Sequence, residues 1–366
     1  MEKLEKIFRN KTILVTGHTG FKGSWLSLWL TRLGAKVIGL SDDIPTKPSN
    51  FDVNDISSLV EDHRIDIRNF KEVSEIVKKN APDFVFHLAA QSLVGESYEN
   101  PLQTMEVNAI GTANILESLV KLDKKVIAIM ITSDKAYDNV EWVWGYKETD
   151  SLGGKDPYSA SKGMAELAIK AYFHSYISED TNKITLGIAR AGNVIGGGDW
   201  AKDRIVPDCI KSWSRNEAVK IRNPNSTRPW QHVFEPLSGY ITLAIRLKEN
   251  SSLSGEAYNF GPPGNQNHTV DELIIEMNKF WDGILWEYEV EKGKAFHEAS
   301  LLKLNCDKAL FDLNWQPTLD FKQTVAMTME WYKEYYNAKS ESMIEFSNKQ
   351  IDEYMALAMK SNNFWK

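Results

Sequence analysis

Two short segments carry side chains that could move protons. Tyr158 and Lys162 stand four residues apart in a stretch of helical character, so they share one face of the expected helix. An ammonium group beside a phenol favours the phenolate and lowers the pKa of the phenol. The phenolate could then accept the proton of an alcohol. Because Tyr and Lys also occur at this spacing on exposed helices, the pair alone does not decide the chemistry.

The second segment is Thr132-Ser133-Asp134-Lys135, which directly follows the apolar run 126–131. A short apolar run of this kind predicts a buried strand, so Ser133 stands where that strand ends. A serine at a strand end, the Tyr158 and Lys162 pair, and a glycine-rich loop upstream together favour a catalytic site over a plain helix surface.

The glycine-rich loop has the sequence Gly17-His18-Thr19-Gly20-Phe21-Lys22-Gly23. It joins an expected strand at 12–16 to an expected helix at 24–33. Glycines permit a tight turn and a close backbone approach to a pyrophosphate, and the amino end of the helix offers unpaired N–H groups. The loop therefore predicts a dinucleotide site, with contacts from Gly17, Thr19, Gly20, Phe21, Lys22 and Gly23.

Further cofactor positions follow the next strands. A carboxylate at the end of the second strand would bind the adenosine ribose and repel a 2′-phosphate, and Asp42 stands near that point. We therefore expect NAD rather than NADP, although Ser41 could hold the decisive position and either Asp42 or Asp43 could cap a turn. The remaining expected contacts lie just beyond later strands: Asp66, Ile67, Leu88, Ala89 and Ala90.

Alternating apolar runs and helical segments indicate what positions these residues. Strands are expected at 12–16, 36–40, 83–88, 126–131 and 257–260, with helices at 24–33, near 109–122, near 269–281 and at 320–337. Continuous apolar strands are typical of a parallel sheet covered on both faces. We predict an α/β protein with a Rossmann-type, doubly wound parallel sheet and a smaller, mixed α/β C-terminal substrate-binding domain.

The two parts are expected to interleave. Residues 1–195 are predicted to form the NAD-binding domain, together with a segment that returns near 230–262. Residues 196–340, rich in Gly, Pro, Trp and Arg, are predicted to be mainly the substrate domain, and 341–366 a polar helical tail.

Composition excludes several classes of function. The 43 Lys and Arg against 50 Asp and Glu give a net charge of −7, so a broad nucleic-acid role is not expected. No stretch approaches the ~18 apolar residues of a membrane helix. The two cysteines, Cys209 and Cys306, predict neither a disulfide framework nor a metal site, and a reducing cytoplasm fits them best. The 12 tryptophans are expected mostly to pack in the core.

At this point the chain resembles a known family. Gly17, Gly20, Gly23, Ser133, Tyr158 and Lys162 are similar to the motif residues of the extended short-chain dehydrogenase/reductase superfamily. The resemblance is narrower in three segments, which look like those of the CDP-glucose 4,6-dehydratases. These are Val15 to Leu26, Thr132-Ser133-Asp134-Lys135, and Arg228-Pro229-Trp230-Gln231-His232-Val233.

The resemblance implies an NAD-dependent lyase that forms a 4-keto-6-deoxy sugar nucleotide. Tyr158, assisted by Lys162 and Ser133, would take the proton of the C4 hydroxyl while hydride passes to NAD. Asp134 would protonate the departing C6 hydroxyl. Lys135 stands where dTDP-glucose dehydratases carry a glutamate that serves as the C5 base. Lys135 could be that base, if it is neutral when it acts, or could merely pair with Asp134.

The resemblance also places substrate contacts. Arg228 and Asn193 look like the residues that bind the substrate diphosphate, and a planar arginine fork suits phosphate oxygens. Arg204, Arg222 and Gln91 are further candidates. A homodimer is expected, as is a role in deoxysugars of bacterial surface polysaccharides such as lipopolysaccharide O-antigen. Two alternatives stay open: a nucleotide-sugar 4-epimerase or ketoreductase, and a non-catalytic dinucleotide-binding regulator.

Overall fold

The computed structural model describes residues 2–178, 183–221, 223–281, 286–288, 301–337 and 342–361. Its centre is a seven-stranded sheet in the order β11-β6-β5-β4-β1-β2-β3, and every neighbouring pair in it is parallel. The chain starts in the middle at β1, moves outward to β3, and returns to build the other half, so the predicted doubly wound sheet is confirmed. The strands are β1 (Thr12–Thr16), β2 (Lys36–Ser41), β3 (Glu61–Arg64), β4 (Phe84–His87), β5 (Val126–Ile131), β6 (Ile184–Ala191) and β11 (Ala257–Phe260).

Both faces of the sheet are buried, because alternate residues of each strand point to opposite faces. Ile13 and Val15 of β1 pack in one apolar cluster, whereas Leu14 between them packs in the other. The first cluster includes residues of α2 (Phe21–Arg32), α10 (Phe234–Glu249), α13 (Phe321–Asn337) and α14 (Met343–Lys360). The second includes residues of α4 (Phe70–Asn80), α7 (Gly111–Val120) and α8 (Pro157–Tyr172). Such two-sided burial explains why the strands are apolar throughout.

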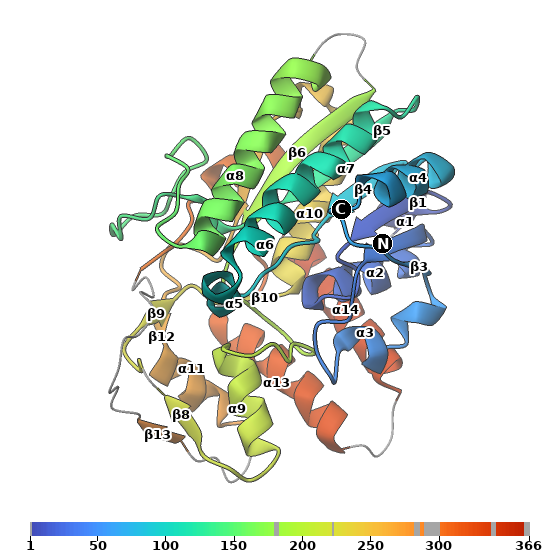
Figure 1. The fold of residues 1–366 in the computed structure, drawn as a ribbon. Coiled ribbons are helices and arrows are strands. Elements are labelled where there is room, and N and C mark those ends of the chain that lie inside the picture. The colour runs from blue at the N-terminus through green and yellow to red at the C-terminus, as the bar shows by residue number, and fades with distance from the viewer. Residues whose placement is uncertain are drawn as a thin grey trace.

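A smaller part lies beyond the carboxyl ends of the strands, in the lower half of Figure 1. Its short strands pair in twos rather than joining the main sheet. They are β8 (Val219–Ile221) with β13 (Trp286–Tyr288), β9 (Thr227–Arg228) with β12 (His268–Thr269), and β7 (Val194–Ile195) with β10 (Gln231–His232). The helices not yet given are α1 (Glu2–Phe8), α3 (Asn50–Val53), α5 (Val94–Glu99), α6 (Pro101–Met105), α9 (Ile205–Trp213), α11 (Val270–Met277) and α12 (Asp307–Leu313).

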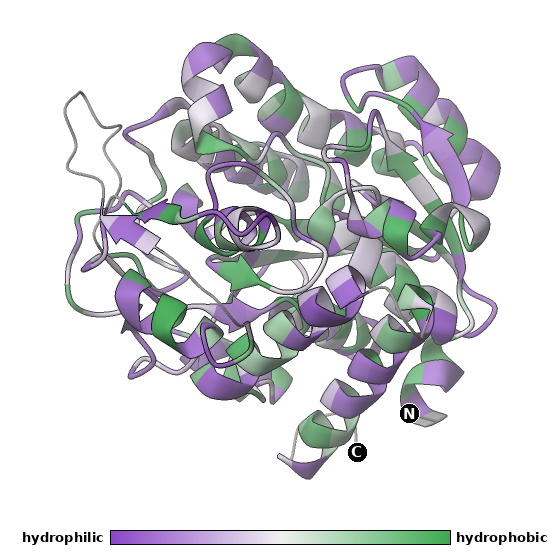
Figure 2. Cartoon of the chain, turned by 90° about the horizontal axis from the view of Figure 1, so that it is seen from below, coloured by the Kyte–Doolittle hydropathy of each residue, from purple (hydrophilic) through white to green (hydrophobic). Residues whose placement is uncertain are grey.

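The C-terminal helix α14 differs from the polar tail that the sequence predicts. Its residues Ile351, Tyr354, Met355 and Ala358 are buried in the first apolar cluster. Figure 2 shows apolar and polar residues alternating along the helices, as expected when each has one buried and one exposed side. The helix is thus a structural part of the core, and its polar residues cover only its outer face.

Large aromatic side chains fill the space between the helices, as the tryptophan count predicts. Trp25, Trp29, Trp315 and Trp331 are among the largest fully buried side chains. Their rings meet edge to face, for example Trp25 against Phe234 with centroids 5.0 Å apart. Contacts of this kind add directional stabilisation to apolar burial.

Candidate active site

The glycine-rich turn between β1 and α2 packs so closely against neighbouring backbone that a side chain at Gly17 or Gly23 would clash. Gly17 has a φ of +75°, and a Cβ there would lie 2.7 Å from the amide nitrogen of Ala89, after β4. A Cβ at Gly23 would lie 2.0 Å from the carbonyl oxygen of Gly17. The first amides of α2 have no acceptor within the helix, so they remain available to an anion at this turn. The turn thus has the form that a pyrophosphate site requires.

The end of β2 carries the three candidates for the contact with the adenosine ribose, Ser41, Asp42 and Asp43. Ser41 is buried, and its hydroxyl oxygen accepts a hydrogen bond from the Thr19 amide at 3.5 Å. Asp42 is exposed and lines the cavity described below. Ser41 and Asp43 line the same cavity, and Asp42 Oδ1 accepts the Asp43 amide at 2.9 Å, so the choice among the three as the ribose contact stays a prediction.

The catalytic candidates converge where β5 ends against α8. Asp156 begins α8 by accepting the Ser159 amide at 2.9 Å, and this cap sets the orientation of Tyr158. Ser133 donates its hydroxyl to Asp134 Oδ1 at 2.9 Å. All the candidates except Lys135 have side chains that are almost fully buried: Ser133, Asp134, Tyr158 and Lys162. Proton-transfer groups at this point are therefore largely shielded from water.

A buried ion pair holds the two catalytic segments together. Glu166, one turn beyond Lys162 in α8, binds Arg190 of β6, and both side chains are inaccessible to solvent. The Thr132 hydroxyl, at the end of β5, donates to Glu166 Oε1 at 2.8 Å. Arg190 also donates to the Tyr137 hydroxyl at 2.6 Å. Because each buried charge has several partners, the pair ties α8 to the ends of β5 and β6.

Burial is the largest influence on the pKa values of Tyr158 and Lys162. It raises the pKa of Tyr158 to about 12, even though a hydrogen bond from Ser133 and the charge of Arg204 lower it. Burial, followed by the positive charge of Lys22, lowers the pKa of Lys162 to about 8. The Lys162 ammonium lies 5.9 Å from the centre of the Tyr158 ring. Burial therefore outweighs the charges that favour the phenolate, and the effect of the Lys162 ammonium on Tyr158 stays a prediction.

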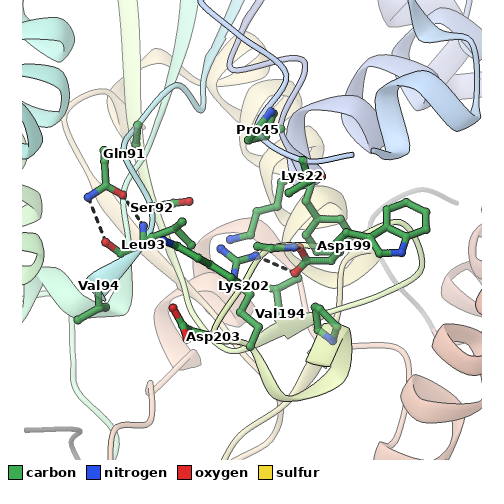
Figure 3. Close-up of a pocket in the computed structure, with 18 of the residues that line it drawn as sticks. Lys22, Pro45, Gln91, Ser92, Leu93, Val94, Val194, Asp199, Lys202 and Asp203 are labelled. Carbon is green, nitrogen blue, oxygen red and sulfur yellow. Dashed lines mark hydrogen bonds and ion pairs between the residues drawn. The ribbon is translucent and has the colours of Figure 1, made fainter. Parts of the chain in front are cut away.

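One cavity of about 990 Å³ contains nearly all the predicted site residues. It opens at the carboxyl ends of the strands, where α/β sheets bind their ligands. Figure 3 shows Gln91 and Val94 on one side and Asp199 across from them. The cofactor candidates and the catalytic candidates line it, as do Gln91, Asn193, Arg204 and Arg228. Arg222 lies outside the described residues.

The substrate candidates differ in what their side chains already bind. Arg204 forms an ion pair with Asp199 at 2.7 Å, and Arg228 donates to the backbone oxygen of Thr227 at 2.8 Å. Asn193 follows β6 with a φ of +53°. The Gln91 side-chain amide donates to Leu93 O of its own loop at 3.0 Å and to Thr104 Oγ1 of α6 at 2.9 Å. Gln91 thus shapes the cavity wall.

Two parts of the site are not among the sequence predictions. Asp199 lines the cavity and pairs with Arg204. Gly192 lies so close to the catalytic segment that a Cβ there would be 1.9 Å from Asp134 Oδ2. Asp199 could have been found from the run Gly196-Gly197-Gly198-Asp199, since consecutive glycines often mark a close backbone approach.

Neither a metal centre nor a membrane span emerges from the described part of the chain. No group of three His, Cys, Asp or Glu residues there is arranged to hold a metal ion. No helix within the same ranges is long and apolar enough to cross a bilayer.

Comparison with known proteins identifies the family. The model of the GDP-mannose 4,6-dehydratase family matches residues 14–328. The chain belongs to the GDP-mannose 4,6-dehydratase family. Among individual proteins, the CDP-glucose 4,6-dehydratase of Salmonella typhimurium is 44% identical over 96% of this chain and 98% of its own length. The CDP-paratose 2-epimerase of Salmonella typhi is 26% identical over 87% of this chain and 98% of its own length.

Solved structures share the fold of this member of the GDP-mannose 4,6-dehydratase family. The epimerase Mth375 of Methanothermobacter thermautotrophicus superposes with a TM-score of 0.77 at 23% identity, covering 95% of this chain and 97% of its own. DesIV, a dTDP-glucose 4,6-dehydratase from Streptomyces venezuelae with NAD and TYD bound, gives a TM-score of 0.73 at 21% identity, covering 89% and 98%.

Proposed function

We propose that this chain is a CDP-glucose 4,6-dehydratase, which converts CDP-glucose to CDP-4-dehydro-6-deoxyglucose and water. The observation that carries the proposal is the 44% identity to an enzyme of that name over 96% of the chain. The cavity supports it, because Ser133, Asp134, Tyr158 and Lys162 all line it. An epimerase or ketoreductase would need the last two residues but no acid and base for the loss of water.

NAD is the cofactor that the residues present fit. The turn at Gly17 and Gly23 leaves room only for backbone, as a pyrophosphate site requires. The Asp42 carboxylate suits the free ribose hydroxyls of NAD and would repel the 2′-phosphate of NADP. Lys162 would bind the nicotinamide ribose. When bound, NAD would take a hydride from C4 of the sugar and return it to C6 as C5 regains its proton, so the reaction has no net redox change.

The first proton transfer belongs to Tyr158. Its phenolate oxygen would accept the proton of the sugar C4 hydroxyl, leaving a ketone at C4. The positive charge of Arg204 favours the phenolate against the burial that opposes it. The Ser133 hydroxyl would act in the same direction once its proton turns from Asp134 to Tyr158. These groups prepare Tyr158 as the base of the oxidation step.

Loss of water needs a base at C5 and an acid at C6. The ketone at C4 acidifies the C5 hydrogen, and the neutral amine of Lys135 would remove that proton. The carboxyl of Asp134 would donate a proton to the C6 hydroxyl, so that the C6–O bond breaks and water leaves. Both residues line the cavity, as a role in this step requires.

The diphosphate of the substrate would bind the basic residues of the cavity. Arg228 and Asn193 are the proposed contacts, together with Arg204, which immediately precedes α9 and lines the same cavity. Arg222 remains proposed from the sequence alone. Gln91 would act by keeping the loop after β4 in shape, since its amide is already hydrogen bonded there.

The proposed assembly is a homodimer, and the proposed location is the cytoplasm, where NAD and nucleotide sugars are made and used. Apolar side chains on α8 and α6 support the dimer: Leu167 is 59% exposed and Leu102 is 75% exposed. Exposed apolar residues of this size on adjacent helices favour contact with another protein surface.

The test is to incubate the purified protein with NAD and, separately, CDP-glucose, dTDP-glucose, UDP-glucose and GDP-mannose. Products are followed by mass spectrometry, with Tyr158→Phe as the matched control. Loss of one water from CDP-glucose alone is the expected result. If CDP-glucose keeps its mass while its stereochemistry changes, the epimerase alternative replaces the dehydratase. Loss of water from another sugar nucleotide would overturn the CDP preference.

A further inference from the structure

Three proposed residues of the reaction site stand in one short segment: Ser133, Asp134 and Lys135. The last two belong to a single 3₁₀ turn, Asp134–Ala136, which lies between the end of β5 and an extended Tyr137. Within the turn, the Tyr137 amide donates to Asp134 O at 3.2 Å. Very short helices are not stable without tertiary contacts. The orientation of this turn must therefore be set by groups outside it.

A buried ion pair bonds to the residue on each side of the turn. On the first side, the Thr132 hydroxyl donates to Glu166 Oε1 at 2.8 Å. On the second side, the Tyr137 hydroxyl accepts a hydrogen bond from Arg190 Nη1 at 2.6 Å. Glu166 and Arg190 bind each other through two contacts, one of them between Oε1 and Nε at 2.7 Å. One ion pair therefore holds both flanks of the turn.

The two charged residues come from the elements that frame the site. Glu166 lies in α8, one helical turn after Lys162 and two after Tyr158. Arg190 is the second-last residue of β6, which pairs with β5. The pair thus links the turn that follows β5 to the helix that carries the proposed base of the oxidation step.

The ion pair itself stays behind the cavity wall. Thr132 lines the cavity, whereas in the described part of the chain neither Glu166 nor Arg190 does. Both charged side chains are inaccessible to solvent. Burial of two charges is costly, and apolar packing would serve equally well as a plain cross-link between α8 and β6. Each charge instead directs a further hydrogen bond at one flank of the turn, as expected if the turn must be held in place.

We propose that Glu166 and Arg190 are positioning residues, which hold the turn Asp134–Ala136 in place against α8 by hydrogen bonding to both of its flanks. The catalytic consequence rests on the proposed function. Oxidation at C4 draws its base from α8 and only Ser133 from the held segment, whereas loss of water draws both its acid and its base from the turn. Loosening the turn therefore slows the loss of water more than the oxidation.

The test removes single hydroxyl groups and leaves the ion pair intact, because an unpaired buried charge is strongly destabilising. Thr132→Val and Tyr137→Phe each delete the hydroxyl on one flank, and Thr132→Ser keeps it. Two controls, Thr328→Val and Tyr354→Phe, delete buried hydroxyls that are hydrogen bonded within the core formed by α10, α13 and α14.

The first measurement is amide hydrogen exchange in the peptide that covers residues 132–137, which requires no substrate. Exchange is expected to become roughly fivefold faster in Thr132→Val and Tyr137→Phe, because each has lost one buried hydrogen bond that holds the turn. Thr132→Ser and both controls are expected to exchange at the wild-type rate in this peptide.

The second measurement is turnover of CDP-glucose together with the absorbance of reduced nicotinamide. In Thr132→Val, kcat is expected to fall about tenfold while KM stays within about twofold of the wild type. Reduced nicotinamide should accumulate during turnover, because loss of water has become the slower step. Thr132→Ser should restore both properties. A merely structural role would lower the amount of folded protein without separating kcat from KM.

Wild-type exchange and wild-type kcat in Thr132→Val and Tyr137→Phe would overturn the proposal, as would equal effects in the two controls. Faster exchange without any loss of kcat would also contradict it, since the held turn would then not serve the reaction. If the wild type dehydrates no sugar nucleotide but exchange rises as expected, the proposed function fails and the hold on the turn stands. If CDP-glucose is dehydrated and neither exchange nor kcat changes in the variants, the reverse holds.

Discussion

Asp134 and Tyr158 divide the proton transfers of the proposed reaction between two neighbouring side chains. The Ser133 hydroxyl donates to Asp134 at 2.9 Å, and turning that proton to Tyr158 would favour the phenolate. Gly192 leaves the space that the Asp134 carboxylate occupies. Because the two groups serve different steps, their removal is expected to stop the reaction at different points.

Tyr158→Phe is expected to reduce turnover of CDP-glucose by roughly 10²–10⁴-fold, because the first proton has no acceptor. Asp134→Asn is expected to permit oxidation at C4 but block the loss of water, since an amide cannot donate the proton. Rapid-mixing absorbance of reduced nicotinamide checks both: a signal should persist in Asp134→Asn and be missing in Tyr158→Phe. Normal product formation by Asp134→Asn would remove Asp134 from its acid role.

At the scale of elements, Glu235 joins three segments from inside the core. It lies on α10, and its Oε1 accepts the amides of Thr318 and Leu319 at 2.9 and 2.7 Å. Its Oε2 accepts the hydroxyl of Tyr354, on α14, at 2.9 Å. Burial raises the pKa of Glu235 to about 7, although these hydrogen bonds lower it. The anchor of the C-terminal helix is therefore sensitive to pH.

The sign of that sensitivity follows from linkage. A carboxyl whose pKa is higher in the folded than in the unfolded protein takes up a proton on folding, so its contribution is fully present below about 4.5 and is lost as pH rises through about 7. Between about pH 5 and 8, Glu235 is expected to cost the wild type on the order of 1–3 kcal/mol of unfolding free energy relative to Glu235→Gln. Urea unfolding of both proteins at the two pH values measures the difference. Equal pH dependence in the two proteins would contradict the assignment.

At the scale of the whole molecule, remote parts of the chain meet behind the cavity wall. The Trp25 indole of α2 donates to the carbonyl of Gly197 at 2.8 Å. A Cβ at Gly197 would lie 2.1 Å from Trp331 of α13, whose indole donates to Ser347 of α14 at 2.9 Å. The segment that carries Asp199 is thus supported by α2 and α13, and through Trp331 by α14.

Trp331→Ala is expected to lower the free energy of unfolding by about 3–5 kcal/mol, because it leaves a cavity that the surrounding rings cannot fill. The affinity for CDP should also fall, since the segment that carries Asp199 and Arg204 loses its support. Urea unfolding and calorimetric titration with CDP measure the two effects. Trp331→Phe, which keeps a ring, should show a smaller loss of stability. An unchanged unfolding free energy in Trp331→Ala would mean that this packing contributes little.

Local patterns in the amino-acid sequence were sufficient to predict the parallel sheet and the glycine-rich turn and to select the catalytic candidates. Apolar runs such as 126–131 predict buried strands, because a strand covered on both faces needs apolar residues on both. The turn at Gly17 and the pair of Tyr158 and Lys162 are equally readable, since a tight turn and one helix face depend only on nearby residues. Where one domain ends and the other begins remains a prediction.

Long-range packing decided the rest. The C-terminal helix has a polar composition, yet its buried face anchors it to Glu235, far away in the sequence. The direction of the Tyr158 pKa shift depends on how completely the folded chain excludes water from the phenol. The spacing of Tyr158 and Lys162 in the sequence carries no information about that burial. Burial and contact between distant segments are properties of the tertiary structure, because they depend on all the surrounding elements at once.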